Sequence, residues 1–150
     1  MEALILNLAP TGLLPTRAQT PHVPLSAEEV AADCARCCAL GVTMLHLHAR
    51  AADGSPSCER AVFGELVAAV RQRVPQAIIV TTTSGRRAPE LEQRAASLTL
   101  EGSQKPDMAS LTLGSLNFSA EASISAPATV MRLAAIMKER GIRPELEVFD

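Results

Sequence analysis

Short runs of apolar and β-branched residues alternate along this chain with longer segments in which apolar residues recur every three or four positions. The short runs predict strands, and the longer segments predict amphipathic helices, because residues three or four apart share one helix face. The predicted strands are residues 3–9, 42–49, 77–83, 108–113 and 145–149, and the predicted helices are residues 26–41, 59–73, 89–98 and 127–141.

Local signals mark where the first helix begins and ends. Ser26, followed three residues later by Glu29, predicts a capping box, in which each side chain accepts a hydrogen bond from the other residue's backbone. Gly41 stands where a left-handed C-terminal stop is expected. A strand-helix-strand unit that repeats four times predicts parallel strands with right-handed crossovers.

Two α/β architectures fit this rhythm, a doubly wound open sheet and a (β/α)8 TIM barrel. The open sheet would be complete with five strands, but the turn at residues 9–12 has no Gly-x-Gly-x-x-Gly pattern and no Walker-type lysine. The barrel places its site at the carboxyl ends of the strands. Polar residues gather at all five of these ends: Asn7, Thr11, His46, His48, Arg50, Thr82, Thr83, Ser84, Thr112, Ser115, Asn117, Glu147 and Asp150.

His46 and His48 are the strongest chemical signal in the chain. In a strand, residues i and i+2 point to the same face, which places these two Cα atoms roughly 6.6 Å apart. Both imidazoles can then converge on one metal ion, at about 2.0–2.1 Å if that metal is zinc. The alternative interpretation is two half-buried histidines that bond to neighbouring backbone.

Composition excludes several classes of function. The chain is 47% hydrophobic with a net charge of −2, and it has no basic stripe and only three aromatic residues, so nucleic acid is not an expected partner. No apolar stretch reaches the 18 or more residues of a membrane span, and the N-terminal residues lack a cationic targeting region. We therefore expect no membrane partner and a cytoplasmic location.

The four cysteines do not predict a disulfide scaffold. Cys34, Cys37 and Cys38 fall within one predicted helix, and the chain has enough apolar residues to form a core without cross-links. We expect reduced thiols. A Cys-x-x-Cys-Cys metal or redox site is the alternative, but no second pair of ligands lies nearby and Cys58 stands alone.

Five motifs together, in order along the whole chain, resemble the β-keto acid cleavage enzyme family. They are Pro24-Leu25-Ser26-Ala27-Glu28-Glu29-Val30-Ala31, His46-Leu47-His48-Ala49-Arg50 with Asp53-Gly54, Thr82-Thr83-Ser84-Gly85, the segment from Lys105-Pro106-Asp107-Met108 to Gly114-Ser115 with Asn117-Phe118, and Pro144-Glu145-Leu146-Glu147-Val148-Phe149-Asp150. The resemblance implies a zinc-dependent (β/α)8 barrel that transfers between a β-keto acid and acetyl-CoA, giving acetoacetate and a new acyl-CoA.

A full barrel takes about 250 residues, so the chain resembles the first five strands and four helices of one. Residues 1–150 would then form the N-terminal part of a single barrel domain. The resemblance assigns zinc to His46 and His48. It places the third ligand, a glutamate, and the late-strand arginine and aspartate that serve proton transfer beyond Asp150.

Further polar residues are candidates for the reaction. Thr82, Ser84 and Thr112 are expected donors to the substrate carboxylate or the developing oxyanion, although each hydroxyl could instead cap a turn. Asn117 is a further expected substrate contact. Glu147 is the expected catalytic carboxylate, because a carboxylate that points into a barrel is costly unless it is paired.

The expected partners are a β-keto acid, acetyl-CoA and further copies of the chain in a homo-oligomer. The loop at residues 12–16 has no acid to bind an ammonium group, so we expect a substrate with an uncharged tail. Two other functions stay open at this point. One is a metal-dependent hydrolase whose His-x-His pair activates water, and the other is a truncated, non-catalytic half-barrel, which alone would expose sheet edges and self-associate.

Overall fold

The computed structural model describes residues 4–119 and 121–149. Five parallel strands form one sheet in the order β1-β2-β3-β4-β7, and a two-stranded antiparallel hairpin, β5-β6, stands apart from it. The strands are β1 (Asn7–Leu8), β2 (Met44–Leu47), β3 (Ile78–Thr81), β4 (Met108–Thr112), β5 (Leu116–Asn117), β6 (Ala122–Ser123) and β7 (Arg143–Glu147).

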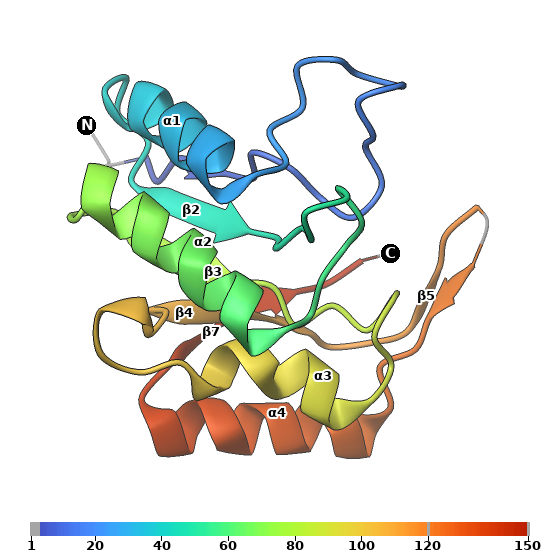
Figure 1. Ribbon diagram of the computed structural model, residues 1–150. Helices are drawn as coiled ribbons and strands as arrows, with labels where there is room; N and C mark the ends of the chain where they lie inside the picture. The colour runs from blue at the N-terminus through green and yellow to red at the C-terminus, as the bar shows by residue number, and fades with distance from the viewer. Residues whose placement is uncertain (1–3, 120, 150) are drawn as a thin grey trace.

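Helices connect successive strands of the sheet and lie outside it (Figure 1). They are α1 (Ala27–Cys38), α2 (Arg60–Arg73), α3 (Leu91–Ala95) with the 3₁₀ turns η1 (Ala96–Thr99) and η2 (Gly102–Gln104), and α4 (Pro127–Arg140). No helix in the described ranges is long and apolar enough to cross a membrane. The sheet order follows the chain order without a reversal, whereas a doubly wound sheet has a switch point.

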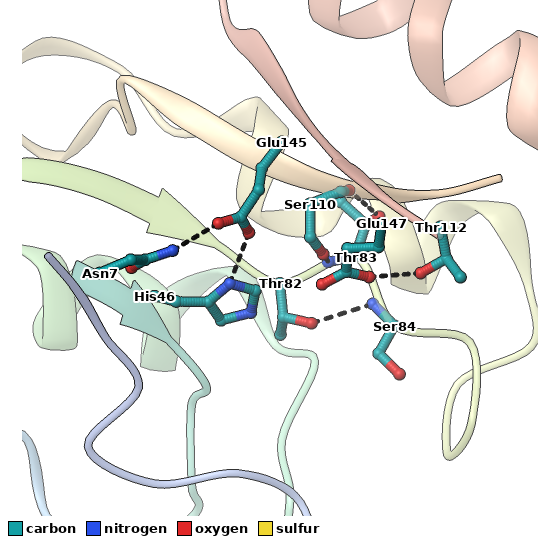
Figure 2. A network of polar contacts seen from close by, with 9 residues as sticks. All are labelled: Asn7, His46, Thr82, Thr83, Ser84, Ser110, Thr112, Glu145 and Glu147. Carbon is teal, nitrogen blue, oxygen red and sulfur yellow. Dashed lines mark hydrogen bonds and ion pairs between the residues drawn. The ribbon is translucent and has the colours of Figure 1, made fainter. Parts of the chain in front are cut away.

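Side chains from the two edges of the sheet meet on its inner face. The Glu145 carboxylate on β7 accepts a hydrogen bond from the Asn7 amide on β1 at 2.6 Å and lies 2.6 Å from His46 Nδ1 on β2 (Figure 2). In a flat sheet the four intervals from β1 to β7 would span about 19 Å. The sheet is therefore curled into an arc, which confirms the prediction of a partial (β/α)8 barrel. That residues 1–150 are the N-terminal part of a single barrel domain stays a prediction.

Two apolar clusters lie between this arc and its helices. Leu45 and Leu47 of β2 are fully buried and pack with Ile79 of β3 and the inner faces of α1 and α2. Leu98, Ala109, Leu111, Leu133, Met137 and neighbouring residues form the second cluster, beneath α3 and α4. Successive side chains of a strand point to opposite faces. Because the leucines of β2 face the helices, the alternating residues His46 and His48 face the inside of the arc.

The structure differs from the predicted elements at four places. The first strand is limited to Asn7–Leu8 instead of residues 3–9, of which residue 3 lies outside the described ranges, and the helix predicted at 89–98 divides into α3 and η1. The last strand begins earlier than predicted, at Arg143, because Pro144 lies on an edge strand that tolerates a missing N–H. The sequence does not predict the β5-β6 hairpin, since its strands are short and most of residues 114–123 are small or polar.

The predicted capping box at the start of α1 is confirmed. Ser26 Oγ accepts a hydrogen bond from the Glu29 N–H at 3.2 Å, and the Glu29 carboxylate accepts from the Ser26 and Leu25 N–H groups at 3.0 Å. Arg17 also pairs with this carboxylate at 2.5 Å. The pair with Arg17 and these backbone hydrogen bonds lower the pKa of Glu29 to about 2.

This cap predicts a pH-dependent contribution to stability. A lowered folded-state pKa stabilises the protein above the unfolded value of 4.5, and this stabilisation disappears as the pH falls from there toward about 2. Because Glu29 is largely exposed, we expect Glu29→Gln to lower the unfolding free energy at pH 7 by only about 0.5–1 kcal/mol. Chemical denaturation at several pH values measures the difference.

Glu28→Gln is the matched control, since it removes the same charge from the same helical turn but only breaks an exposed pair with Arg73. The gap between Glu29→Gln and wild type should shrink below pH 4.5, and the gap for Glu28→Gln should be smaller at pH 7. A gap for Glu29→Gln that stays constant down to pH 3 would contradict the role of its charge.

Candidate functional site

A cavity of about 360 Å³ opens where the carboxyl ends of the strands meet. It is lined by Gly12, Leu13, Leu14, Pro15, His46, His48, Thr82, Ser84, Arg86, Thr112, Leu116, Phe118, Ser123, Glu147 and Phe149. Every strand of the arc thus contributes its last residues or the loop that follows it. A larger cavity of about 530 Å³ lies between α2 and the start of α1, and Arg50 is the only one of the polar strand-end residues in its wall.

His46 has a fixed ring orientation. Its Nδ1 lies 2.6 Å from Glu145 Oε2, and a carboxylate only accepts hydrogen bonds, so Nδ1 carries the proton in the neutral ring (Figure 2). Nε2 then keeps its lone pair. A carboxylate behind one ring nitrogen is the usual support of a histidine that binds a metal through the other nitrogen.

His48 contributes a second, neutral imidazole. Its ring stacks on that of His46 with a centroid distance of 5.1 Å, and its Nδ1 is buried with no hydrogen-bond partner in the described part of the chain. Burial, followed by the charges of His46, Arg50 and Arg86, lowers the pKa of His48 to about 3. A neutral ring with an unpartnered buried nitrogen fits a metal ligand, because buried polar atoms are otherwise almost always bonded.

The most closely gathered donors on the inner face are His46, Glu145 and Glu147. Their nearest ligand atoms all lie within 4.8 Å of one another, and His48 is not in this group. A nitrogen and carboxylate oxygens are a ligand set that divalent transition metals accept. Glu145 was not predicted as a site residue, although the alternation of Glu145 and Glu147 on one strand face was a signal for it.

Hydroxyl groups line the other side of the cavity. Thr112 Oγ1 donates a hydrogen bond to Glu147 Oε2 at 2.5 Å, and Thr82 Oγ1 accepts one from the Ser84 N–H at 3.1 Å (Figure 2). Thr83 is buried and bonds to Ser110, away from the cavity. The structure therefore brings together His46, His48, Thr82, Ser84, Thr112 and Glu147 of the predicted site residues.

One predicted substrate-binding residue lies elsewhere. Asn117 is exposed in the hairpin and is not in the cavity wall, since its neighbours Leu116 and Phe118 take the inward positions. Asp150 lies outside the described residues. A role for Asn117 in binding substrate stays a prediction from the sequence.

Two arginines support the site in different ways, one from behind the cavity wall and one within it. Arg50 is buried and donates hydrogen bonds to the carbonyl of Leu13, at 2.8 Å, and to that of Pro15, which holds the loop after β1 over the cavity. Arg86 lines the cavity itself, and its guanidinium carbon lies 3.1 Å from the centroid of the Phe118 ring. No sequence pattern distinguishes Arg86 from its neighbours, because its partner is in the unpredicted hairpin.

Comparison with known proteins agrees with this geometry. Residues 3–150 match the family model described as beta-keto acid cleavage enzyme. The chain is 33% identical over its full length to the 3-keto-5-aminohexanoate cleavage enzyme of Fusobacterium nucleatum, of which it covers 54%. Over 99% of its length it is 37% identical to the 3-oxoadipate:acetyl-CoA acetyltransferase of Cupriavidus necator, of which it covers 51%. The chain thus spans about half the length of these relatives.

Solved structures support the fold. A ternary complex of ObcA with a C4-CoA adduct and oxalate superposes on 89% of this chain with a TM-score of 0.77 and 23% sequence identity. The match covers 32% of the ObcA chain. This similarity supports the arrangement of strands and helices as part of a larger α/β structure.

The contact between opposite edges of the sheet predicts an energetic coupling. In a double-mutant cycle of Asn7→Ala and Glu145→Ala, we expect a coupling energy of roughly 0.5–3 kcal/mol, because the two side chains share a hydrogen bond. Denaturant unfolding of the four proteins, with a chelator present to remove metal, measures it.

Asn7→Ala combined with Glu121→Ala is the matched control, since Glu121 pairs with Arg87 and shares no partner with Asn7. That cycle should give effects that add within about 0.5 kcal/mol. Additive effects for Asn7 and Glu145 as well would mean that the sheet is not curled in solution.

Proposed function

The chain belongs to the beta-keto acid cleavage enzyme family, and we propose that its protein transfers between a β-keto acid and acetyl-CoA, giving acetoacetate and a new acyl-CoA. The observation that carries this proposal is one cavity in which imidazoles, carboxylates and hydroxyls converge at the ends of five strands. The names of the relatives support it, since one is a β-keto acid cleavage enzyme and another an acetyl-CoA acetyltransferase.

We propose zinc as the metal. His46 would bind through Nε2 while Glu145 holds its Nδ1 proton, and His48 would bind as a neutral ring. The unpartnered Nδ1 of His48 supports a metal at this wall of the cavity. The carboxylates of Glu145 and Glu147, which lie close to His46 but are not proposed as ligands, add the negative charge that favours a cation there. When bound, zinc supplies a Lewis acid for the oxygens of the substrate's ketone and carboxylate.

Glu147 is the proposed catalytic carboxylate. Thr112 donates a hydrogen bond to one of its oxygens, which fixes the direction of the carboxylate. The second oxygen stays available to take a proton from the α-carbon of the substrate or to position water. Glu147 and His46 belong to the same group of close donors, so proton transfer would occur beside the metal.

Thr82 and Ser84 are proposed to orient the substrate carboxylate. Thr82 Oγ1 already accepts the Ser84 N–H, so its own hydrogen points elsewhere and can be donated to a ligand. Apolar side chains form much of the remaining wall: Leu13, Leu14, Leu116, Phe118 and Phe149. They would place apolar groups around a bound substrate, which strengthens each hydrogen bond to it.

We also propose a cytoplasmic location and a homo-oligomeric assembly. The four cysteines are all free thiols in the structure, as suits a reducing compartment. Exposed apolar residues flank both edge strands, among them Leu4 and Ile5 near β1 and Val148 and Phe149 after β7. These surfaces need cover, from further chain or from another copy.

A metal-dependent hydrolase and a non-catalytic half-barrel are the other candidates. A hydrolase would cleave its substrate without acetyl-CoA, and a non-catalytic protein would turn nothing over with or without metal. Assay of the full-length protein with a panel of β-keto acids, with and without acetyl-CoA, separates the three. Acetoacetate formation that requires acetyl-CoA is the expected result.

The proposed metal site predicts the effect of removing either histidine. His46→Ala and His48→Ala should each lose most of the bound zinc, because the loss of one protein ligand removes a large share of metal affinity. Zinc content after dialysis, measured by atomic emission, checks this. His22→Ala is the control, because His22 is the third histidine of the chain and lies exposed in the loop before α1. Wild-type zinc content in both site variants would overturn the assignment.

The proposed role of Glu147 predicts a selective loss of rate. Glu147→Gln should lower kcat by about 10²–10⁴-fold, as expected for a lost proton-transfer group, while zinc stays bound. Thr112→Val, which removes only the hydrogen bond to Glu147, should lower kcat by less. Steady-state kinetics with parallel zinc analysis tests both variants, and an unchanged kcat in Glu147→Gln would exclude the assigned role.

A further inference from the structure

Arg86 brings a positive charge into the cavity that the proposed reaction does not use. Among the described residues it is the only arginine or lysine in the cavity wall. It follows Ser84 in the loop after β3, and its backbone N–H donates to Ser84 Oγ at 3.4 Å. The charge therefore lies in the same cavity wall as the hydroxyls that are proposed to orient the substrate.

The guanidinium is held in a position that leaves its donors free. Its carbon lies 3.1 Å from the centroid of the Phe118 ring, so an aromatic face covers one side of the plane. The N–H groups of an arginine lie in that plane and form a rigid fork that matches a carboxylate. Within residues 4–119 and 121–149, no acceptor or carboxylate pairs with the Arg86 side chain, and its Nε is buried.

Neighbouring arginines are satisfied by the protein. Arg87 pairs with Glu121 at 3.3 Å, and the buried Arg94 donates to the Thr83 carbonyl at 2.9 Å. Arg86 differs from both because its donors have no such partner in the described part of the chain. A buried donor without a partner costs free energy that a ligand can recover.

The composition of the loop after β1 agrees with an anionic ligand. The loop of Gly12, Leu13, Leu14 and Pro15 covers the cavity and has no acid that could bind a cationic substrate or neutralise Arg86. The ketone and first carboxylate of a β-keto acid are already assigned to the metal, Thr82 and Ser84. Any further anionic group would find its partner in Arg86.

Building on the proposed function, we propose that Arg86, held against Phe118, binds a second carboxylate at the far end of the substrate, so that the enzyme prefers β-keto dicarboxylic acids. This replaces the sequence-based expectation of an uncharged tail. The absence of an acid from the loop after β1 argues against a cationic group at the far end of the substrate. The positive charge of Arg86 favours binding of an anionic group there over a neutral one.

A pair of substrates that differ at one end tests the proposal. 3-Oxoadipate and 3-oxohexanoate have the same six-carbon chain, but one ends in a carboxylate and the other in a methyl group. We expect the full-length enzyme to have a higher kcat/KM for 3-oxoadipate. Arg86→Met should lower that value roughly 10- to 100-fold, as for a lost hydrogen bond to a charged group, and should change kcat/KM for 3-oxohexanoate by less than about two-fold.

Arg87→Met is the matched control, since it removes the same charge from the adjacent residue, which pairs with Glu121 outside the cavity wall. It should leave the preference unchanged. Phe118→Leu keeps the charge but removes the ring, and should lose part of the preference. Circular dichroism and zinc content of each variant verify that the fold and the metal are retained.

Several outcomes would overturn the proposal. Equal losses for both substrates in Arg86→Met would mean that Arg86 binds the carboxylate they share. A rise in KM for acetyl-CoA alone would assign Arg86 to a phosphate of the coenzyme. A wild-type preference for 3-oxohexanoate would exclude an anionic tail.

Calorimetric titration with 3-oxoadipate in the absence of acetyl-CoA separates this proposal from the proposed function. Binding that weakens in Arg86→Met but not in Arg87→Met supports the anion site even if no β-keto acid is turned over, in which case only the proposed reaction fails. Turnover of 3-oxohexanoate with wild-type binding of 3-oxoadipate in Arg86→Met would leave the reaction intact and overturn the role of Arg86.

Discussion

The contact of one carboxylate with both ends of the sheet determines the rest of the site. Glu145 on β7 bonds to Asn7 on β1 and to His46 on β2, which is possible only when the sheet curls. The curl makes an inner face, and the same contact fixes the tautomer of His46 on that face. Architecture and chemistry are therefore coupled through a single side chain. An open sheet with the same strands would keep the residues and lose the site.

The two histidines differ in the surroundings that keep their rings neutral. His46 has a carboxylate behind its ring. His48 has none among the described residues, and burial, together with the charges of His46, Arg50 and Arg86, lowers its pKa and keeps it neutral. A histidine must be neutral to bind a metal, and these two environments each provide a neutral ring in a different way. The leucines that alternate with these histidines on β2 pack under α1 and α2. This packing fixes the strand, so that both imidazole rings stay on the inner face.

The sequence predicted the parts of the site that depend on period-two alternation and on local signals. The same-face spacing of His46 and His48, the capping box of α1 and the polar ends of the strands all follow from local rules. The partners of these residues could not be predicted in the same way. Glu145 meets His46 across 99 positions of sequence, and such a contact depends on the curl of the whole sheet. The pairing of Arg86 with Phe118 likewise needs a hairpin whose residues 116–117 and 122–123 carry almost no strand signal.

Buried Arg94 explains how that unpredicted hairpin is kept in place. From α3 it donates to the Thr83 carbonyl at 2.9 Å and to the Ile124 carbonyl at 3.4 Å, which ties the loop after β3 to the segment that follows β6. Gly85 permits this contact, because a Cβ there would lie 3.0 Å from the Arg94 guanidinium. Arg94 thus joins the loop that carries Arg86 to the hairpin that carries Phe118. Two exposed loops that were not connected in this way would not hold a guanidinium against one ring. The stacking of Arg86 on Phe118 therefore depends on the buried hydrogen bonds of Arg94.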